Sequence, residues 1–275
     1  MSSGELFEIS RLKELVDLNT SDTMKLTNRV SKILMVALSI VIISEANGQE
    51  ESKLQVYMGF QAAPNYSYRV LSNSSNDPNV DNMIEFLNNR ESTSLGFRFA
   101  GVIGVEVFKR WTAEAGISYL RNRTQFELIS EDESGIETGI GSDQDYDNGK
   151  LINSLDYLGI PMRIIYNLGT ETLRIRATFG FTPQILLSQN TKIKLFKDGE
   201  NTIDQSFQDG ENAVGFNLSP LIGLGAEYSL NDQFTLTAEG IARFGLVNTK
   251  EDSPINSYTY SSELNVGLNY YFLGR

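Results

Sequence analysis

The sequence predicts an all-β protein: an eight-stranded antiparallel up-and-down transmembrane β-barrel, preceded by a signal-peptide helix. Three observations support this fold class. Apolar and polar residues alternate with a period of two in about eight segments, as β-strands require. No helix that could cover the sheet lies between them. Long polar connections alternate with tight turns, which places the long loops at one end of a barrel.

A charged and then apolar leader precedes the first strand. Arg29 and Lys32 stand before the apolar run 33–43, and the small residues Ala46 and Gly48 follow it. The run is shorter than the ~20 residues of a membrane-spanning helix. This order is typical of a secretory signal peptide cleaved before the next residue, with a retained anchor or buried helix as the alternative.

The leader divides the chain into three parts. We expect a signal peptide at 24–48 and an outer-membrane β-barrel domain at 49–275. Residues 1–23 then represent either a start codon assigned too early or an extended charged region of the signal peptide.

The eight expected strands each carry apolar residues at every second position. In chain order, the strands and examples from their apolar faces are 54–70 (Val56, Met58, Phe60), 94–107 (Phe97, Phe99, Ile103), 111–128 (Trp111, Ala113, Ile117), 158–168 (Ile160, Met162, Ile164), 173–184 (Ile175, Phe179, Phe181), 214–228 (Phe216, Leu218, Ile222), 234–247 (Phe234, Leu236, Phe244) and 258–272 (Leu264, Val266, Leu268).

The connections between these strands fall into two classes. Tight turns are expected at 108–110, 169–171 and 230–233, long polar loops at 71–92, 129–153 and 188–211, and a moderate loop at 248–256. Because short and long connections alternate, an outer-membrane barrel with this layout has both termini on the periplasmic side and its long loops outside the cell.

Ten charged residues lie on the opposite, more polar faces of the strands. A charge facing lipid costs ~2 to 4 kcal/mol at the bilayer midplane, so we expect all ten to face inward and to form ion pairs there. They are Arg98, Arg163, Arg174, Arg176 and Arg243 with Glu106, Glu114, Glu227, Glu239 and Glu263.

The balanced charges leave two readings of the barrel interior. Eight strands enclose a space just wide enough for side chains to fill, which favours a paired polar core that only stabilises the barrel. A narrow ion path or gated pore is the alternative.

Aromatic residues are expected near both ends of the strands, where they would form two girdles at the membrane interfaces. Toward the turns these are Trp111, Tyr166, Tyr228, Phe234, Tyr270 and Phe272, and toward the loops Tyr68, Tyr119, Phe126, Phe181, Phe216 and Tyr258.

Composition excludes several functions. The chain has no Cys and no His. Disulfides, thiolate metal sites and serine–histidine catalysis are therefore impossible, and we expect neither an enzyme nor a cofactor. From Gln49 onward the 18 basic and 29 acidic residues leave a formal charge of −11, which opposes binding to nucleic acid.

One acidic stretch is a candidate metal site. Asp143, Asp145 and Asp147 alternate as calcium ligands can. However, Gly149 stands one place too late for an EF-hand loop, and Ser154 occupies the position of its bidentate glutamate. A solvated acidic loop is therefore favoured over a calcium site.

Three motifs carry a family resemblance. They are LGIPMRIIY at 158–166, GLGAEYSL at 223–230 and LNVGLNYYF at 264–272. The chain resembles the eight-stranded outer-membrane β-barrel proteins of Bacteroidetes known as PorT-like. The resemblance implies that Tyr270 and Phe272 form the signal read by the barrel-assembly machinery, although 273–275 trail past it.

We therefore expect an integral protein of a Gram-negative outer membrane, in contact with its lipid. Its function would be structural or a surface interaction with an unidentified surface or secretion partner. A small passive pore or a secretion-associated component is the alternative. A soluble ligand-binding barrel of the lipocalin kind is less favoured, because it would place the apolar faces inward.

Overall fold

The structure is a computed structural model, and it describes residues 55–75, 77–108, 110–129, 148–170, 172–197, 200–208, 214–249 and 253–272. All of them belong to one compact unit, Leu54–Arg275. The expected signal peptide and the boundary at Gln49 lie outside the described residues.

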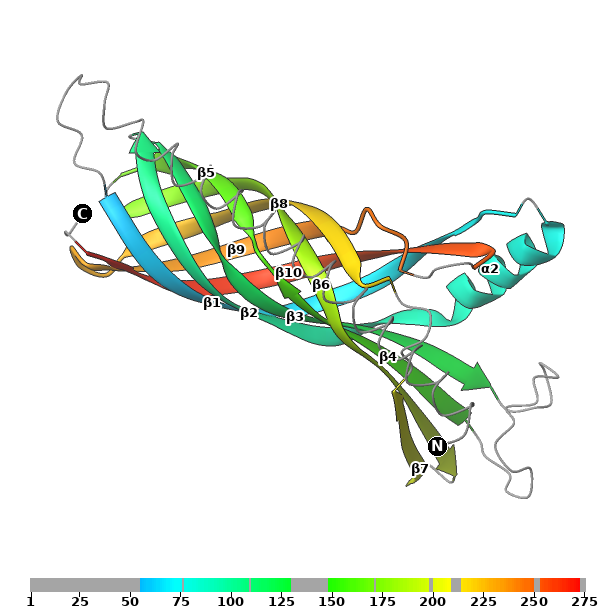
Figure 1. Cartoon of the computed structure of the whole chain (residues 1–275). Helices are drawn as coiled ribbons and strands as arrows, with labels where there is room; N and C mark the ends of the chain where they lie inside the picture. The colour runs from blue at the N-terminus through cyan, green and yellow to red at the C-terminus, as the bar shows by residue number, and fades with distance from the viewer. Residues whose placement is uncertain are drawn as a thin grey trace, which may run out of the picture. The chain divides into compact units, whose positions relative to one another are not determined.

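The described residues of this unit form ten strands and one helix (Figure 1). In chain order they are β1 (Gln55–Asn73), α2 (Pro78–Arg90), β2 (Glu91–Phe108), β3 (Trp111–Ile129), β4 (Asn148–Gly159), β5 (Met162–Gly169), β6 (Leu173–Lys197), β7 (Glu200–Gln208), β8 (Phe216–Ser229), β9 (Phe234–Phe244) and β10 (Ile255–Tyr271).

The strands close into a ring of eight, as the sequence predicts. Every neighbouring pair is antiparallel, and β1 pairs with β10 from Tyr57↔Tyr271 to Asn73↔Ile255. Closure leaves no unpaired edge in the wall, which is the condition for a sheet to stand in lipid.

One of the eight wall strands is built from two segments, β4 and β5. They are separated at Ile160 and Pro161, because proline has no N–H to donate to the sheet. Hydrogen bonds continue across the break: Gly116 N donates to Pro161 O at 3.1 Å, and Ile160 N donates to Pro183 O at 3.0 Å. β3 pairs with both segments, so the wall stays closed.

The two ends of the ring differ. The end with the tight turns after β2, β5 and β8, here called the turn end, also holds the start of β1 and the end of β10. A left-handed Gly169 with φ +127° makes one of these turns. The opposite end is called the loop end.

The prediction of a polar loop at 188–211 is wrong over most of that range. β6 continues to Lys197, and β7 returns beside it in an antiparallel pair. Polar and apolar residues alternate there only from Lys192 to Leu195, and this run is too short to predict a pair of strands. β7 pairs only with β6 and stands outside the ring.

The loop expected at 71–92 contains a helix. Asp77 caps α2 by accepting a hydrogen bond from Asn79 N, and Pro78 occupies its first turn, where proline is tolerated. No residue of α2 is buried. No helical segment among the described residues is both long and apolar enough to cross a membrane. The expected loop at 129–153 is also shorter, since β4 begins at Asn148.

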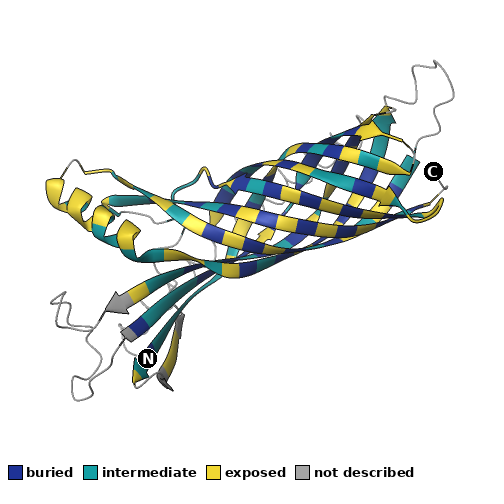
Figure 2. Ribbon diagram, turned by 180° about the vertical axis from the view of Figure 1, so that it is seen from behind, coloured by how far each residue is buried: buried dark blue, intermediate teal, exposed yellow. Residues whose placement is uncertain are grey.

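Past the ring, the wall continues on one side as a flap. We define the flap as residues 122–129 of β3, 148–157 of β4, 186–197 of β6 and 200–208 of β7. These strands lean away from the ring, on the side away from α2 (Figures 1 and 2).

Burial alternates along every wall strand (Figure 2). Within the ring, residues that face outward are mostly apolar, and Leu224 is 67% exposed. Residues that face inward are mostly polar, and Arg98 is 1% exposed. This arrangement is the reverse of a barrel that dissolves in water, and it is the arrangement that lipid requires.

Candidate functional site

The ten charged residues singled out in the sequence all lie on the inward faces of the wall strands. Eight of them are buried, and the remaining two, Glu106 and Arg174, lie near the turn end with side chains 12% and 15% exposed. Their contacts form three groups, one in the middle of the ring, one nearer the loop end and one at the turn end.

The middle group contains Glu114, Arg163, Arg176, Glu227 and Glu239. Glu114 of β3 and Arg163 of β5 are direct partners in the sheet, and Arg163 Nε donates to Glu114 Oε1 at 2.7 Å. Arg176 donates to Glu227 at 2.7 Å. Glu239 of β9 lies between the two arginines, 3.5 Å from Arg163 Nη1 and 3.7 Å from Arg176 Nε.

The group nearer the loop end is centred on Glu263. Its carboxylate accepts hydrogen bonds from Arg98 at 2.9 Å and from Arg243 at 2.5 Å. Arg98 also donates to Asn265 at 2.8 Å, and Arg243 to the Thr182 hydroxyl at 2.9 Å. One carboxylate therefore compensates two arginines, and neutral side chains take their remaining donors.

Neutral residues connect the two groups. The Gln61 amide donates to Glu114 and accepts from Arg98, both at 3.4 Å. Asn265 donates to Glu239 at 3.4 Å. Tyr57 donates its hydroxyl proton to Glu114 at 2.8 Å, and its ring occupies the space beside Gly104, where a Cβ would lie 2.1 Å from it.

The third group joins opposite sides of the ring at the turn end. Arg174 of β6 donates to Glu106 of β2 at 2.8 Å, and the Tyr271 hydroxyl donates to the same carboxylate at 3.4 Å. β2 and β6 are three places apart in the ring of eight, as are β5 and β9 with Arg163 and Glu239. Ion pairs therefore cross the interior at two levels.

Sequence reasoning did not single out the neutral partners Tyr57, Gln61, Thr182 and Asn265. They occupy the same alternate strand positions as the charged residues, which face inward, and this was the only sequence signal that could have identified them. Which carboxylate each arginine reaches depends on the stagger of the strands, and alternation carries no information about that stagger.

The outward face carries aromatic residues toward both ends. At the turn end the rings of Trp111 and Tyr166 lie 4.7 Å apart, and those of Phe234 and Tyr270 5.2 Å apart. The other residues predicted there, Tyr228 and Phe272, are exposed.

Toward the loop end, Tyr68, Phe181 and Phe216 are exposed, whereas Tyr119 and Tyr258 are partly buried. Tyr68 stacks on Tyr260 at 5.6 Å. Phe126 differs from the others, because it shares the face of buried Asn122 and Thr124 and its ring lies 6.2 Å from Phe86 of α2.

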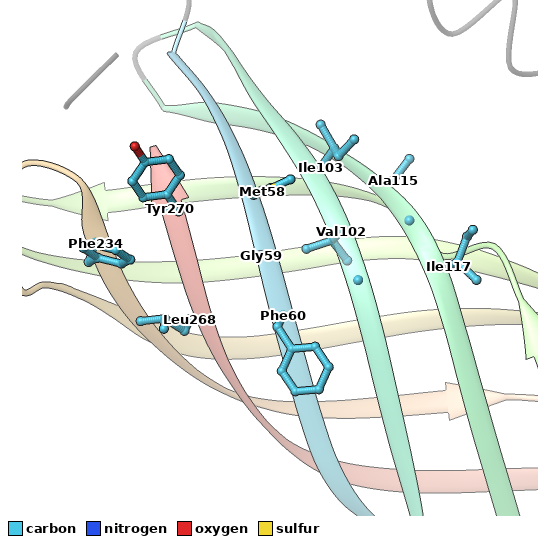
Figure 3. A pocket seen from close by; sticks show the side chains of 12 residues that line it. Met58, Gly59, Phe60, Val102, Ile103, Ala115, Ile117, Phe234, Leu268 and Tyr270 are labelled. Atoms are coloured by element: carbon cyan, nitrogen blue, oxygen red, sulfur yellow. The ribbon is translucent and has the colours of Figure 1, made fainter. Parts of the chain in front are cut away.

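Small residues leave a shallow apolar groove on the outward face near the turn end (Figure 3). Its volume is about 540 Å³, and Met58, Phe60, Ile103, Ile117 and Leu268 border it. Its lining resembles the rest of the lipid-facing wall, and lipid tails are the expected contents of such a surface.

The proposed assembly signal lies in the closing strand. Tyr270 pairs with Met58 of β1, and Phe272 N donates to Val56 O at 3.1 Å. The weak calcium candidates Asp143, Asp145 and Asp147 lie outside the described residues. Within the described residues, no group of three or more acidic side chains is placed to hold a metal ion.

An ion pair also stands on the outward face just past Tyr119. Arg121 donates to Asp156 at 2.6 and 2.7 Å, and Ser188 donates to the same carboxylate at 3.0 Å. Burial raises the pKa of Asp156, but the hydrogen bonds from Arg121 and Ser188 lower it by more, so the pKa lies below its ordinary value.

A closed ring of eight antiparallel strands, apolar outside and polar inside, is the architecture of outer-membrane barrel proteins. The family described as "Outer membrane protein beta-barrel domain" matches residues 33–272, and the chain belongs to this family. This membership assigns the protein to the outer membrane.

Solved structures with a related outline have little sequence identity to the chain. Neisserial surface protein A is 13% identical with a TM-score of 0.38, covering 78% of this chain and 96% of its own. OprG from Pseudomonas aeruginosa is 11% identical with a TM-score of 0.42, covering 80% of this chain and 95% of its own. Ail of Yersinia pestis is 11% identical with a TM-score of 0.36, covering 79% of this chain and 98% of its own. Comparison with curated proteins gives no match.

Proposed function

We propose that this protein is an integral outer-membrane barrel whose interior is closed by ion pairs, and that it has a structural or surface-interaction role at its loop end. Two ion pairs that span the interior, Arg163 with Glu239 and Arg174 with Glu106, support the proposal that it is closed. Large buried side chains such as Arg98, Arg176 and Tyr57 fill the space around them.

Conductance across a planar bilayer tests the closed interior. We expect the refolded full chain to insert without steady conductance. The double variant Arg163→Ala/Glu239→Ala removes one spanning pair and should admit ions. A steady current through the wild type would instead support the small passive pore, for which the chain of buried polar side chains would be the path.

The orientation is part of the same proposal. Long connections at one end and tight turns at the other favour periplasmic termini and extracellular loops. A cysteine introduced at Ser75, in the connection before α2, should react with a membrane-impermeant maleimide in intact cells, while one at Asp232 in the turn after β8 should not. The reverse labelling would invert the orientation.

The finer assignments also remain proposals. A PorT-like, secretion-associated role rests on the motifs at 158–166, 223–230 and 264–272. Recognition of Tyr270 and Phe272 by the assembly machinery rests on their place at the end of the closing strand. Substituting both with alanine should lower the amount of folded protein in the outer membrane, measured against the Tyr228→Ala variant.

A further inference from the structure

The outward face of the flap gathers basic residues that the closed interior does not explain. On β3, every second residue from the outward-facing Tyr119 lies on this face, and the sheet register extends the face to β4 and β6. Its basic residues are Arg121, Arg123, Lys150, Lys192 and Lys194. We call this surface the cationic face.

Among the residues that the structure describes, the acidic side chains on the same face compensate only part of this charge. They are Glu127, Asp156 and Asp204. Asp156 pairs with Arg121 at 2.6 Å, and Asp204 with Lys192 at 2.8 Å. In this described part of the flap, five cations against three carboxylates leave a positive surplus, on a chain whose formal net charge is −12.

Two lysines on this face oppose each other directly. Lys150 of β4 and Lys194 of β6 are partners in the sheet, with Glu127 and Asp204 next to them in the same row. Among the described residues neither lysine has an ion-pair partner within 4.0 Å. Like charges directly opposite destabilise a sheet, so an anion that bridges them would be favoured.

The lean of the flap determines what the cationic face meets. It continues the lipid-facing wall immediately beyond Tyr119 and the exposed Leu158. The flap leans away from the ring (Figure 1). For a ring that stands in lipid, this lean turns the outward side of the flap toward the surrounding membrane surface. The headgroup layer lies at that height, just past the aromatic girdle.

We propose that the cationic face binds the phosphate groups of anionic lipid headgroups at the loop end, with Lys150 and Lys194 holding one phosphate between them. This proposal rests on the membrane-spanning placement of the ring in the proposed function, but not on its closed interior. It predicts a lipid preference that depends on these two lysines.

The test compares lipid selectivity in vesicles that contain the refolded full chain. Fluorescent phosphatidic acid and phosphatidylcholine compete for the protein, and the ratio of their binding constants is the readout. We expect a preference for phosphatidic acid that falls roughly fivefold for each lysine replaced in Lys150→Gln/Lys194→Gln. Raising the salt concentration should weaken the wild-type preference.

Lys197 provides a matched control. It lies on β6 with the opposite parity from Lys194, so Lys197→Gln removes the same charge from the other face of the flap. This variant should keep the wild-type ratio. Equal loss in Lys197→Gln would show a general charge effect and overturn the proposal.

Other outcomes would also overturn it. The proposal would be contradicted if the wild type showed no preference for phosphatidic acid, or if Lys150→Gln/Lys194→Gln kept the full preference. Complete competition by inorganic phosphate at equal concentration would assign the site to a soluble anion. Heat-modifiable gel migration and bilayer conductance report separately on the closed barrel, so its failure is distinguishable from failure of the lipid site.

Discussion

Most of the buried charges in the barrel have more than one polar partner. Glu263 shows this most clearly, because its carboxylate accepts hydrogen bonds from both Arg98 and Arg243. Removing a single partner from such a group leaves a charge that is buried and uncompensated, and this is more costly than removing a whole pair.

Glu263→Gln should therefore lower the free energy of unfolding by about 3 to 5 kcal/mol, because it leaves Arg98 and Arg243 without the carboxylate that they share. Urea unfolding of the barrel in lipid vesicles measures the change. Glu85→Gln makes the same chemical change on the exposed surface of α2 and should shift the value by less than about 0.5 kcal/mol. Equal effects of the two variants would mean that the interior pairs do not carry stability.

The Asp156 carboxylate should make stability depend on pH. Since its pKa is lower in the folded than in the unfolded chain, the stabilisation is full above the ordinary pKa of an aspartate. It is lost as the pH falls through the lower, folded value. Asp156→Asn should therefore be less stable than wild type at pH 7, and the difference should shrink below about pH 4. Unfolding temperatures at both pH values measure this.

The elements differ in how much they contribute to the ring. β4 and β5 together supply one wall strand, whereas β7 extends only the flap. An element that pairs with a single neighbour outside the ring can be removed without opening the wall.

Replacing residues 198–210 with a short Gly-Ser linker should therefore leave the barrel closed. The shortened protein should retain heat-modifiable migration, as folded outer-membrane barrels do. A matched replacement in β9, residues 234–244, removes a wall strand and should abolish it. Loss of the folded band in the β7 replacement would show that the flap is needed for closure.

The accuracy of sequence prediction also varies from element to element. Wall strands such as β2 and β10 were predictable, because lipid on one side and charge on the other impose strict alternation. β7 and the end of β6 were not, because they lie beyond the hydrocarbon layer and their polar and apolar residues alternate only over the short run from Lys192 to Leu195. The inward placement of the charged residues follows from parity, but the contact between Arg163 and Glu239 depends on ring geometry.

At the scale of the whole molecule, the seam between β1 and β10 completes the wall. Met58 and Tyr270 are direct partners across it and both face outward. The chain contains no cysteine, so an introduced pair has no competitor.

Met58→Cys/Tyr270→Cys should form a disulfide on oxidation, because directly opposed residues of antiparallel strands have a suitable Cα separation. After boiling, the oxidised variant should migrate differently from its reduced form, since its denatured chain is closed into a loop. Met58→Cys/Leu264→Cys places the two cysteines several residues out of register and should remain reduced. Failure of the first pair to cross-link would contradict the seam.

The seam also has a consequence for biogenesis. It joins residues from the first and last strands, so this step has the highest sequence separation in the fold and closes the largest loop. A polypeptide still being synthesised cannot take this step until its final strand has emerged. Until then the apolar faces of its hairpins stay exposed to water, which would favour a holding chaperone between export and insertion.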